Sequence, residues 1–262
     1  MYKSFTNTSF LGKKVIYLPS CQSTNDIAAD FIRKGEAGEG SLVITSEQTA
    51  ARGQRGNSWE SSPYQNLTFS LVFTPTFLQP VDQFQLSMAV SLGIRDFLSQ
   101  HLSPEVKVKW PNDLYFREKK LCGILIENQL QGHTLEYSIA GIGLNINQQQ
   151  FTHSRAGSLS QFTGKTYVLN DLLEELLPLL EHRYLELKRL EWGQLKATYQ
   201  KELLGFQAIR KYREVASGRT FRGQVLGINQ SGQLAIHDLD LKSKVYYFKF
   251  KEVEFLMNNV SG

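Results

Sequence analysis

Cysteine is scarce in this chain of 262 residues, which contains only Cys21 and Cys122. The two stand far apart and lack the paired spacing of metal-binding cysteines, which argues against a disulfide scaffold and a cysteine-based zinc site. Long apolar runs are also missing. No segment reaches the roughly 18 apolar residues of a membrane-spanning helix, and the N-terminus has no apolar leader-like stretch. We therefore expect a cytoplasmic protein without a membrane partner.

Charge of one sign is not concentrated anywhere in the chain. The 29 Lys and Arg residues against 25 Asp and Glu residues give a net charge of +4, and no block of about five like charges occurs. This mild basic balance suits a phosphate-bearing ligand or an acidic partner, but it falls short of a basic tail that binds nucleic acid. The 41% hydrophobic content supports one core and a small second domain.

Hydrophobic periodicity predicts an α+β protein. Strands are expected over residues 14–18, 41–46, 66–73, 106–110, 114–116, 121–128 and 135–145, and helices over 23–35, 82–102, 169–190 and 194–204. The polar, aperiodic stretch 148–166 predicts a long loop, and such loops are more often ligand lids than linkers.

Beyond residue 205 the pattern consists only of short strands. They are expected over 211–215, 220–228, 233–238 and 244–250, with turns at Ser217-Gly218 and Ser231-Gly232. Such a run predicts a small SH3-like barrel. We therefore expect two domains, residues 1–205 and 206–262.

Arginine and glycine alternate in Arg52-Gly53-Gln54-Arg55-Gly56, after the strand expected at 41–46 and before Trp59. Glycines let backbone N–H groups approach an anion, and arginines bind phosphate or carboxylate oxygens. The loop has the form of neither a P-loop nor a dinucleotide-binding turn. A plain solvated turn explains the same residues, so the loop alone does not decide between the two interpretations.

Glycine also occurs inside two expected strands, as Gly123 in 121–128 and as Gly141 and Gly143 in 135–145. Glycine inside a strand usually marks a bulge or a close approach of another group. We therefore expect these strands to form a sheet surface against which something lies.

Five motifs follow one another from about residue 15 to 147. They are Ser23-Thr24-Asn25, the loop of residues 52–59, Trp110-Pro111-Asn112-Asp113, Lys120-Leu121-Cys122-Gly123-Ile124 and Gly141-Ile142-Gly143-Leu144-Asn145. In this order and spacing they resemble the catalytic domain of the biotin protein ligases. The resemblance implies an α+β fold: a mixed-sheet catalytic domain of the biotin/lipoate ligase type and a small C-terminal SH3-like β-barrel. Only 22 residues precede Ser23, so we expect the monofunctional type without an N-terminal DNA-binding domain.

The resemblance implies an ATP-dependent ligase. In that family biotin and ATP form biotinyl-5′-AMP and pyrophosphate, and a specific lysine of a biotin carboxyl carrier protein or domain then takes the biotin and releases AMP. A carboxylate that attacks a triphosphate needs fixed positive charge and in-line placement. We expect Mg²⁺ to enter with ATP and to be bound through phosphate oxygens and water, with no dedicated protein cage.

The resemblance also assigns residues. Lys120 would contact the biotin carboxylate and the α-phosphate, and Arg52 and Asp113 complete the expected catalytic set. The expected biotin-binding residues are Ser23, Thr24, Asn25, Gln48, Arg52, Gly53, Gln54, Trp59, Lys120 and Gly123. Those expected to bind ATP or the adenylate are Arg52, Arg55, Asn112, Lys120 and Asn145, and Phe151 or Phe162 is a candidate to stack on adenine.

Local structure offers an alternative explanation for several of these residues. Lys120 could belong to a solvated turn, Ser23 or Thr24 could simply cap a helix, and Trp59 could be core. The residues Pro111-Asn112-Asp113 suit a turn without any ligand.

The chain departs from the family at one position. Many members have Gly-Arg-Gly-Arg where this chain has Ala51-Arg52-Gly53-Gln54. The second arginine, which the family links to retention of the adenylate, is therefore Gln54. Either Arg55 takes over this role, or the adenylate is held less tightly.

Two rival functions remain. A lipoate-protein ligase or octanoyl transferase would share the fold, but the Arg-Arg-x-x-Gly-Gly-Gly run of those enzymes is absent. A regulator that binds nucleic acid through the barrel would need a clear basic face, whereas Glu214, Asp238 and Asp240 are mixed with the basic residues there. We expect no nucleic-acid partner. A homodimer paired side by side through sheet edges stays open.

Overall fold

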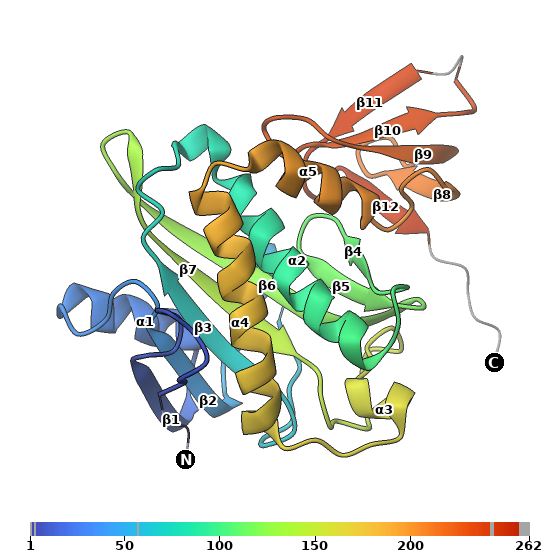
Figure 1. Cartoon of the computed structure of the whole chain (residues 1–262). Coiled ribbons are helices and arrows are strands. Elements are labelled where there is room, and N and C mark those ends of the chain that lie inside the picture. The colour runs from blue at the N-terminus through green and yellow to red at the C-terminus, as the bar shows by residue number, and fades with distance from the viewer. Residues whose placement is uncertain (1, 3, 57, 242–243, 257–262) are drawn as a thin grey trace.

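The computed structural model describes residues 2, 4–56, 58–241 and 244–256, and the side chain of Arg55 is also outside the described part. Its larger sheet has seven strands in the order β1-β2-β3-β7-β6-β5-β4 (Figure 1). These are β1 (Val15–Cys21), β2 (Leu42–Gln48), β3 (Leu67–Phe73), β4 (Lys107–Lys109), β5 (Asp113–Phe116), β6 (Lys119–Gln131) and β7 (Thr134–Leu144). Strands β1 and β2 are parallel and the other neighbours antiparallel. The predicted mixed sheet is thus confirmed.

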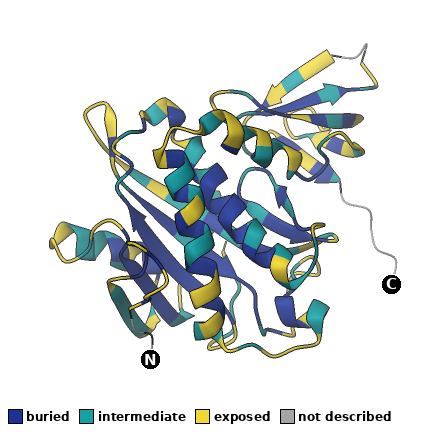
Figure 2. Ribbon diagram, in the orientation of Figure 1, coloured by how far each residue is buried: buried dark blue, intermediate teal, exposed yellow. Residues whose placement is uncertain are grey.

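Helices cover both faces of this sheet. Helix α1 (Thr24–Arg33) packs on β2, β3 and β7, whereas α2 (Phe84–His101) and α4 (Leu169–Lys188) pack together on the opposite face (Figure 1). Side chains alternate across a strand, so Val43 faces Ala28 of α1 while Ile44 joins the main core. Figure 2 shows the middle strands buried and the loop tips exposed.

The stretch 148–166 is not a structureless loop. It contains α3 (Leu159–Thr163). This helix begins with a capping box formed by Ser158 and Gln161, and it ends at Gly164, which has a left-handed conformation. The prediction of a long loop was wrong over these residues, because five residues are too few to show helical periodicity. A 3-10 turn, η2 (Pro80–Asp82), precedes α2, so Asp82, where the predicted helix begins, lies in this turn.

The C-terminal strands form a second, antiparallel sheet in the order β11-β10-β9-β8-β12. They are β8 (Ile209–Glu214), β9 (Thr220–Ile228), β10 (Leu234–Asp238), β11 (Lys244–Phe248) and β12 (Val253–Leu256), and α5 (Trp192–Lys201) precedes them. This sheet is consistent with an SH3-like domain. Within the described residues β11 and β12 do not pair with each other, so the strands do not close into a barrel there.

The two sheets share one apolar core. Leu204, Tyr212 and Val225 belong to the same buried cluster as the larger sheet, and Trp110 Nε1 donates a hydrogen bond of 2.9 Å to the carbonyl of Gly232. The boundary between residues 205 and 206 therefore stays a prediction.

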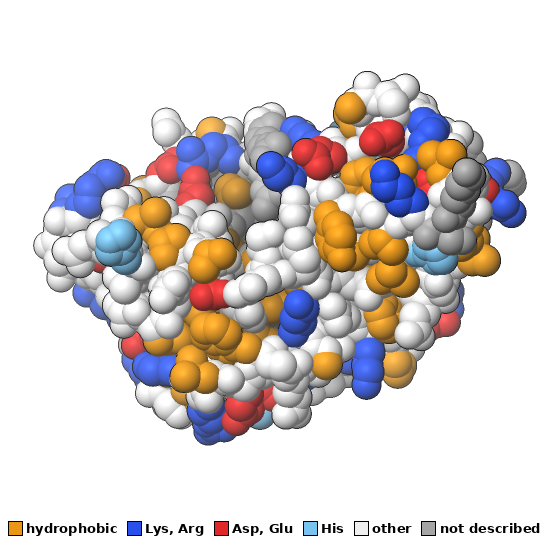
Figure 3. Space-filling view, turned by 90° about the horizontal axis from the view of Figure 1, so that it is seen from above, with side chains coloured by type: hydrophobic (Ala, Val, Ile, Leu, Met, Phe, Trp, Pro, Cys, Tyr) orange, Lys and Arg blue, Asp and Glu red, His pale blue; other side chains and the backbone are white. Residues whose placement is uncertain are grey.

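On the face seen in Figure 3, basic and acidic side chains are interspersed. No helix in the described part of the chain is long and apolar enough to cross a bilayer.

Candidate active site

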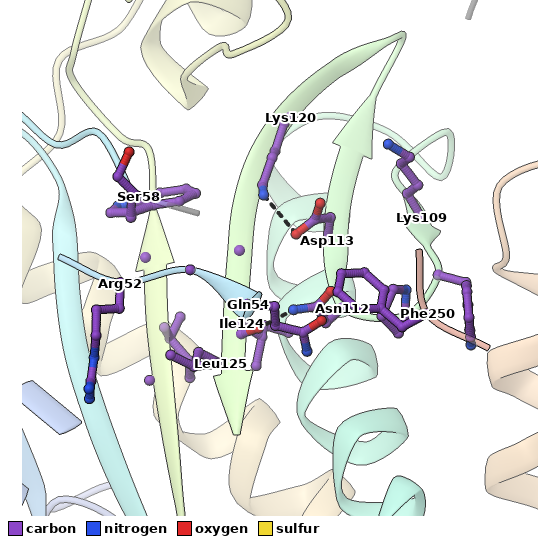
Figure 4. Close-up of a pocket in the computed structure, with 18 of the residues that line it drawn as sticks. Arg52, Gln54, Ser58, Lys109, Asn112, Asp113, Lys120, Ile124, Leu125 and Phe250 are labelled. Atoms are coloured by element: carbon purple, nitrogen blue, oxygen red, sulfur yellow. Dashed lines mark hydrogen bonds and ion pairs between the residues drawn. The ribbon is translucent and has the colours of Figure 1, made fainter. Parts of the chain in front are cut away.

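A cavity of about 600 Å³ lies on the α1 side of the larger sheet and reaches the C-terminal sheet (Figure 4). Most of the predicted site residues line it: Ser23, Thr24, Asn25, Gln48, Arg52, Gly53, Gln54, Trp59, Asn112, Asp113, Lys120 and Gly123. The five motifs, which are distant in sequence, therefore lie together around one cavity. Arg55 has its side chain outside the described part, and Asn145 lies beside the cavity.

One end of the cavity is a buried polar network at the start of α1. Gln48 Oε1 accepts hydrogen bonds from Thr24 N at 2.7 Å and from Thr24 Oγ1 at 3.2 Å. Ser70 Oγ donates toward Thr24 Oγ1 and Asn25 Oδ1, at 2.7 and 2.6 Å. Ser23 occupies the N-cap position, but its side chain makes no capping hydrogen bond. Gln48 therefore caps the helix, and the Ser23 hydroxyl is left at the cavity wall.

Arg52 is held by carboxylates near this end. Its Nη2 lies 2.5 Å from Asp26 Oδ1 and 3.5 Å from Glu127 Oε1. Glu127 Oε2 in turn accepts a hydrogen bond of 2.7 Å from Asn25 Nδ2. Figure 4 shows Arg52 directed away from Lys120 and Asp113. Arg52 thus joins the Arg/Gly loop to α1 and β6.

Trp59 lines the middle of the cavity, and its ring lies so close to β6 and β7 that it explains why these strands contain glycine. A Cβ built on Gly143 would lie 2.4 Å from Trp59 Cε2, and one on Gly123 would lie 2.9 Å from Trp59 Cζ3. A Cβ on Gly141 would lie 2.5 Å from Asn25 Oδ1. Such contacts are far inside van der Waals distance, so β6 and β7 need glycine there. The predicted close approach is confirmed, and Trp59 is both a packing residue and a cavity wall.

The other end of the cavity is charged. Lys120 Nζ lies 2.8 Å from Asp113 Oδ1 and 5.4 Å from the centre of the Trp59 ring. The tight turn before β6 consists of Arg117 and Glu118, both with positive φ, and Lys120 lies on the strand itself. The alternative of a solvated turn lysine is therefore wrong. Pro111 and Asn112 do lie in a turn between β4 and β5, as that interpretation has it, and Asp113 is the first residue of β5.

A strap of residues 152–157 is joined to the Lys120 backbone. Lys120 N donates to the carbonyl of Arg155 at 2.7 Å, and Gly157 N donates to the carbonyl of Lys120 at 3.0 Å. Asn145 is buried beneath this strap, where its Nδ2 donates to the carbonyl of Gly157 at 3.0 Å. It does not line the cavity, so its role toward a nucleotide stays a prediction.

The remaining predicted residues have structural contacts. Asn112 Nδ2 donates to the carbonyl of Ile124. Phe162 packs edge-on against Phe116 at 4.9 Å between ring centres, and neither Phe162 nor Phe151 lines the cavity. Cys122 is fully buried, and burial raises the pKa of its thiol, so this thiol is poorly suited to act as a nucleophile.

Several lining or supporting residues were not predicted from the sequence. Ser70 and Glu127 complete the network around Asn25, and Lys109 and Arg155 line the charged end. A serine within the otherwise apolar strand Phe69-Ser70-Leu71 was an available signal for Ser70. The others are recognisable only once distant strands are placed side by side.

No group of three or more His, Cys, Asp or Glu residues in the described part of the chain could hold a metal ion. The donors present fit an ion that arrives with its own oxygen ligands, such as Mg²⁺ bound to a polyphosphate, with Asp113 as an acidic neighbour.

Comparison with known proteins agrees with this geometry. Residues 17–145 match the Biotin/lipoate A/B protein ligase family. The curated "Bifunctional ligase/repressor BirA" of Bacillus spizizenii is 29% identical over 245 residues, which cover 91% of this chain and 74% of that protein.

Two solved structures show the same fold. The biotin protein ligase from Aquifex aeolicus, in complex with biotin and ATP, superposes with a TM-score of 0.75 at 24% identity, covering 93% of this chain and 98% of that one. The ligase from Leishmania major, in complex with biotinyl-5-AMP, superposes with a TM-score of 0.60 at 25% identity, covering 90% and 98%. With the five motifs gathered in one cavity, these matches show that the chain belongs to the biotin/lipoate A/B protein ligase family, as a biotin protein ligase.

Proposed function

We propose that the cavity activates biotin with ATP as biotinyl-5′-AMP and delivers it to a lysine of a biotin carboxyl carrier protein or domain. The observation that carries this proposal is the order of polar, apolar and charged groups along the cavity. A buried hydrogen-bonding network at Thr24 and Gln48 lies at one end, the Lys120–Asp113 pair at the other, and the Trp59 wall between them. Biotin has the same sequence of groups: a polar ureido ring, an apolar tail and a carboxylate.

The polar end supplies what a ureido group needs. A buried polar group that loses water must find partners, and an unpaired one costs about 1–3 kcal/mol. The hydroxyls of Ser23 and Thr24 and the amide of Gln48 offer both donors and acceptors at the wall. The tail would lie against the Trp59 indole, which itself packs on the glycine backbone of β6 and β7.

The charged end supplies the electrostatics of the first step. The biotin carboxylate attacks the α-phosphorus of ATP, the bond from that phosphorus to the oxygen bridging to the β-phosphate breaks, and pyrophosphate leaves. The Lys120 ammonium would exchange its contact with Asp113 for the carboxylate and the α-phosphate, and so reduce their mutual repulsion. The backbone pairing of Lys120 with the strap fixes its position before the substrates arrive.

The second step needs the same groups. The amine of the carrier lysine attacks the acyl carbonyl, the amide C–N bond forms, the anhydride C–O bond breaks and AMP leaves, while the amine loses a proton to solvent. Lys120 would stabilise the negative charge that returns to the phosphate of AMP. The carrier would approach the open side of the cavity between the two sheets.

ATP–pyrophosphate exchange tests the activity. With purified protein and Mg²⁺, we expect exchange with biotin but not with lipoate or octanoate. Exchange with lipoate or octanoate instead would move the chain to the other acyl ligases of its family. No exchange with any of these acids by a folded protein would contradict the proposal.

We further propose that the chain has no nucleic-acid partner and acts in the cytoplasm. Basic residues of the C-terminal sheet are paired: Arg213 with Glu254, Arg219 with Asp238 and Arg222 with Asp240. Such pairing leaves little charge to release counterions from DNA. Retention on duplex DNA at moderate salt would contradict this part. The edge strand β1 of the larger sheet leaves room for a homodimer paired side by side through sheet edges.

A further inference from the structure

Four polar side chains join three parts of the fold beside the cavity. Asn25 and Asp26 belong to α1, Arg52 to the Arg/Gly loop and Glu127 to β6. Glu127 Oε2 accepts a hydrogen bond of 2.7 Å from Asn25 Nδ2, and Glu127 Oε1 lies 3.5 Å from Arg52 Nη2. The same Arg52 nitrogen lies 2.5 Å from Asp26 Oδ1. These four residues, here called the polar junction, link the start of α1 and the loop to β6.

The polar junction uses the hydrogen-bond donors of Asn25. Asn25 Nδ2 donates to Glu127 and, at 3.3 Å, to the carbonyl of Leu125, while Asn25 Oδ1 accepts from Ser70 Oγ at 2.6 Å. An amide nitrogen has two hydrogens, so both are bonded within the protein. Asn25 is buried, and its Oδ1 lies 2.5 Å from where a Cβ on Gly141 would stand. Asn25 therefore fixes the start of α1 on the sheet.

Arg52 stands where the Arg/Gly loop closes on itself. It forms an antiparallel bridge with Ser58, and Trp59 N donates to the carbonyl of Ala51 at 3.1 Å. The position of Arg52 thus sets where the loop begins and where Trp59 returns to the cavity. Figure 4 shows the Arg52 side chain directed away from Lys120. Its guanidinium accordingly belongs to the polar junction and not to the charged end.

Glu127 reaches these groups from outside the cavity. Gly123, Leu125 and Glu127 alternate along β6 and share one face of the strand, but only Gly123 and Leu125 line the cavity. Glu127 contacts Asn25 with one carboxylate oxygen and Arg52 with the other, and both of these residues do line it. A group that touches two walls of a site but not its interior can act on a ligand only through those walls.

We propose that Glu127 is a positioning residue for the biotin end of the cavity, which holds the start of α1 and the base of the Arg/Gly loop at the separation that the ureido ring requires. This inference rests on the proposed function. The groups offered to that ring lie on both sides of the polar junction, with Thr24 on α1 and Gly53 and Gln54 in the loop. Walls that are already in place cost less to order when the ligand binds. Loss of Glu127 therefore weakens biotin binding without changing the chemistry at Lys120.

Glu127→Gln tests this role in the whole protein. The glutamine oxygen can still accept from the buried Asn25 amide, so the fold should be kept, whereas the charge opposite Arg52 is gone; a thermal melt checks the fold. We expect biotin affinity by calorimetry to fall about fivefold, the upper range for a half-exposed ion pair. At saturating biotin, kcat for pyrophosphate exchange should stay within about twofold of the wild type, because the reacting end is untouched.

Two further measurements show whether Glu127 acts through Arg52. When Arg52→Met is already present, Glu127→Gln should change biotin affinity by less than about twofold, since the pair is absent in both proteins. In the absence of biotin, trypsin should cleave the Arg/Gly loop of Glu127→Gln at least about threefold faster than that of the wild type. Glu136→Gln, at an exposed carboxylate of β7 outside the cavity lining, is the matched control and should behave like the wild type.

The outcomes separate the positioning role from the function. Wild-type biotin affinity in Glu127→Gln would overturn the role. An equal loss of affinity in the Arg52→Met protein, or a fall in kcat as large as the fall in affinity, would overturn it as well. Failure of the wild type to exchange pyrophosphate with biotin refutes the proposed function instead. The cleavage rates then decide the role of Glu127: faster cleavage of Glu127→Gln supports it, and equal rates overturn it.

Discussion

Trp59 and Gly143 touch so closely that no side chain fits between them: a Cβ on Gly143 would lie 2.6 Å from Trp59 Nε1. The indole is thereby pressed against the backbone of β7 and, through Gly123, against β6. This contact fixes the end of the Arg/Gly loop over the sheet. A Cβ at Gly123 or Gly143 would push the indole outward, so the depth of the cavity depends on glycine at both positions.

Gly143→Ala should therefore displace the indole. Overpacking of a filled site costs about 1–3 kcal/mol, and we expect a lower melting temperature together with at least tenfold weaker biotin binding by calorimetry. Gly193→Ala is the control, because Gly193 lies in α5 with no atom within 4 Å of a built Cβ. Alanine there should stabilise the fold by about 0.5–1 kcal/mol and leave binding unchanged.

Replacement of Lys120 tests the charged end. Lys120→Met should leave the fold intact, since its side chain is 29% exposed, but lower biotin-dependent pyrophosphate exchange by about 10²–10³-fold, as loss of a preorganised charge does. Arg117→Asn removes a neighbouring, 73% exposed cation at a positive-φ position that asparagine tolerates, and should exchange normally. Wild-type turnover in Lys120→Met would refute its assigned role.

Gln54 lines the cavity where many family members have arginine. If this difference loosens the adenylate, Gln54→Arg should slow release of biotinyl-5′-AMP by about tenfold, the effect of one added charge-assisted contact. The release rate can be followed by rapid filtration with labelled biotin. An unchanged rate would mean that other groups already retain the adenylate.

Glu181 provides a pH-dependent contribution to stability. Its carboxylate accepts backbone hydrogen bonds from Ser9, Phe10 and Leu11 at 2.6, 2.9 and 2.9 Å. Burial alone would raise the Glu181 pKa, but these hydrogen bonds outweigh it and hold the pKa below its ordinary value. Because the folded pKa is the lower one, the contribution is complete above about pH 4.3 and is lost as the pH falls through the folded pKa.

Glu181→Gln should accordingly lower the free energy of unfolding by about 1.5–3 kcal/mol at neutral pH, and by less in acid. Urea melts between pH 7 and 3 measure the difference. Glu36→Gln, at an exposed carboxylate, should show no such trend. A constant difference for Glu181→Gln across this range would contradict the assignment.

Sequence patterns predicted much of the local structure. The strands around Leu42 and Leu67, the helix that begins at Thr24 and the glycines of β6 and β7 followed from periodicity and residue type alone. Helix α3 was missed, although Ser158 and Gln161 already had the spacing of a capping box. Its five residues contain too few apolar side chains to show the repeat of about 3.6 residues that marks a helix in a sequence.

The sequence by itself determined the elements and the set of motifs, because hydrophobic period, glycine and capping residues act over a few neighbouring positions. Only the tertiary structure decided that Gln48 rather than Ser23 caps α1, that Arg52 pairs with Asp26, and that Lys109 lies beyond Lys120. Each of these relationships joins residues from different helices, strands or loops. Their distances are set by the order in which seven strands pack, and that order follows from burial of the whole core rather than from any local pattern.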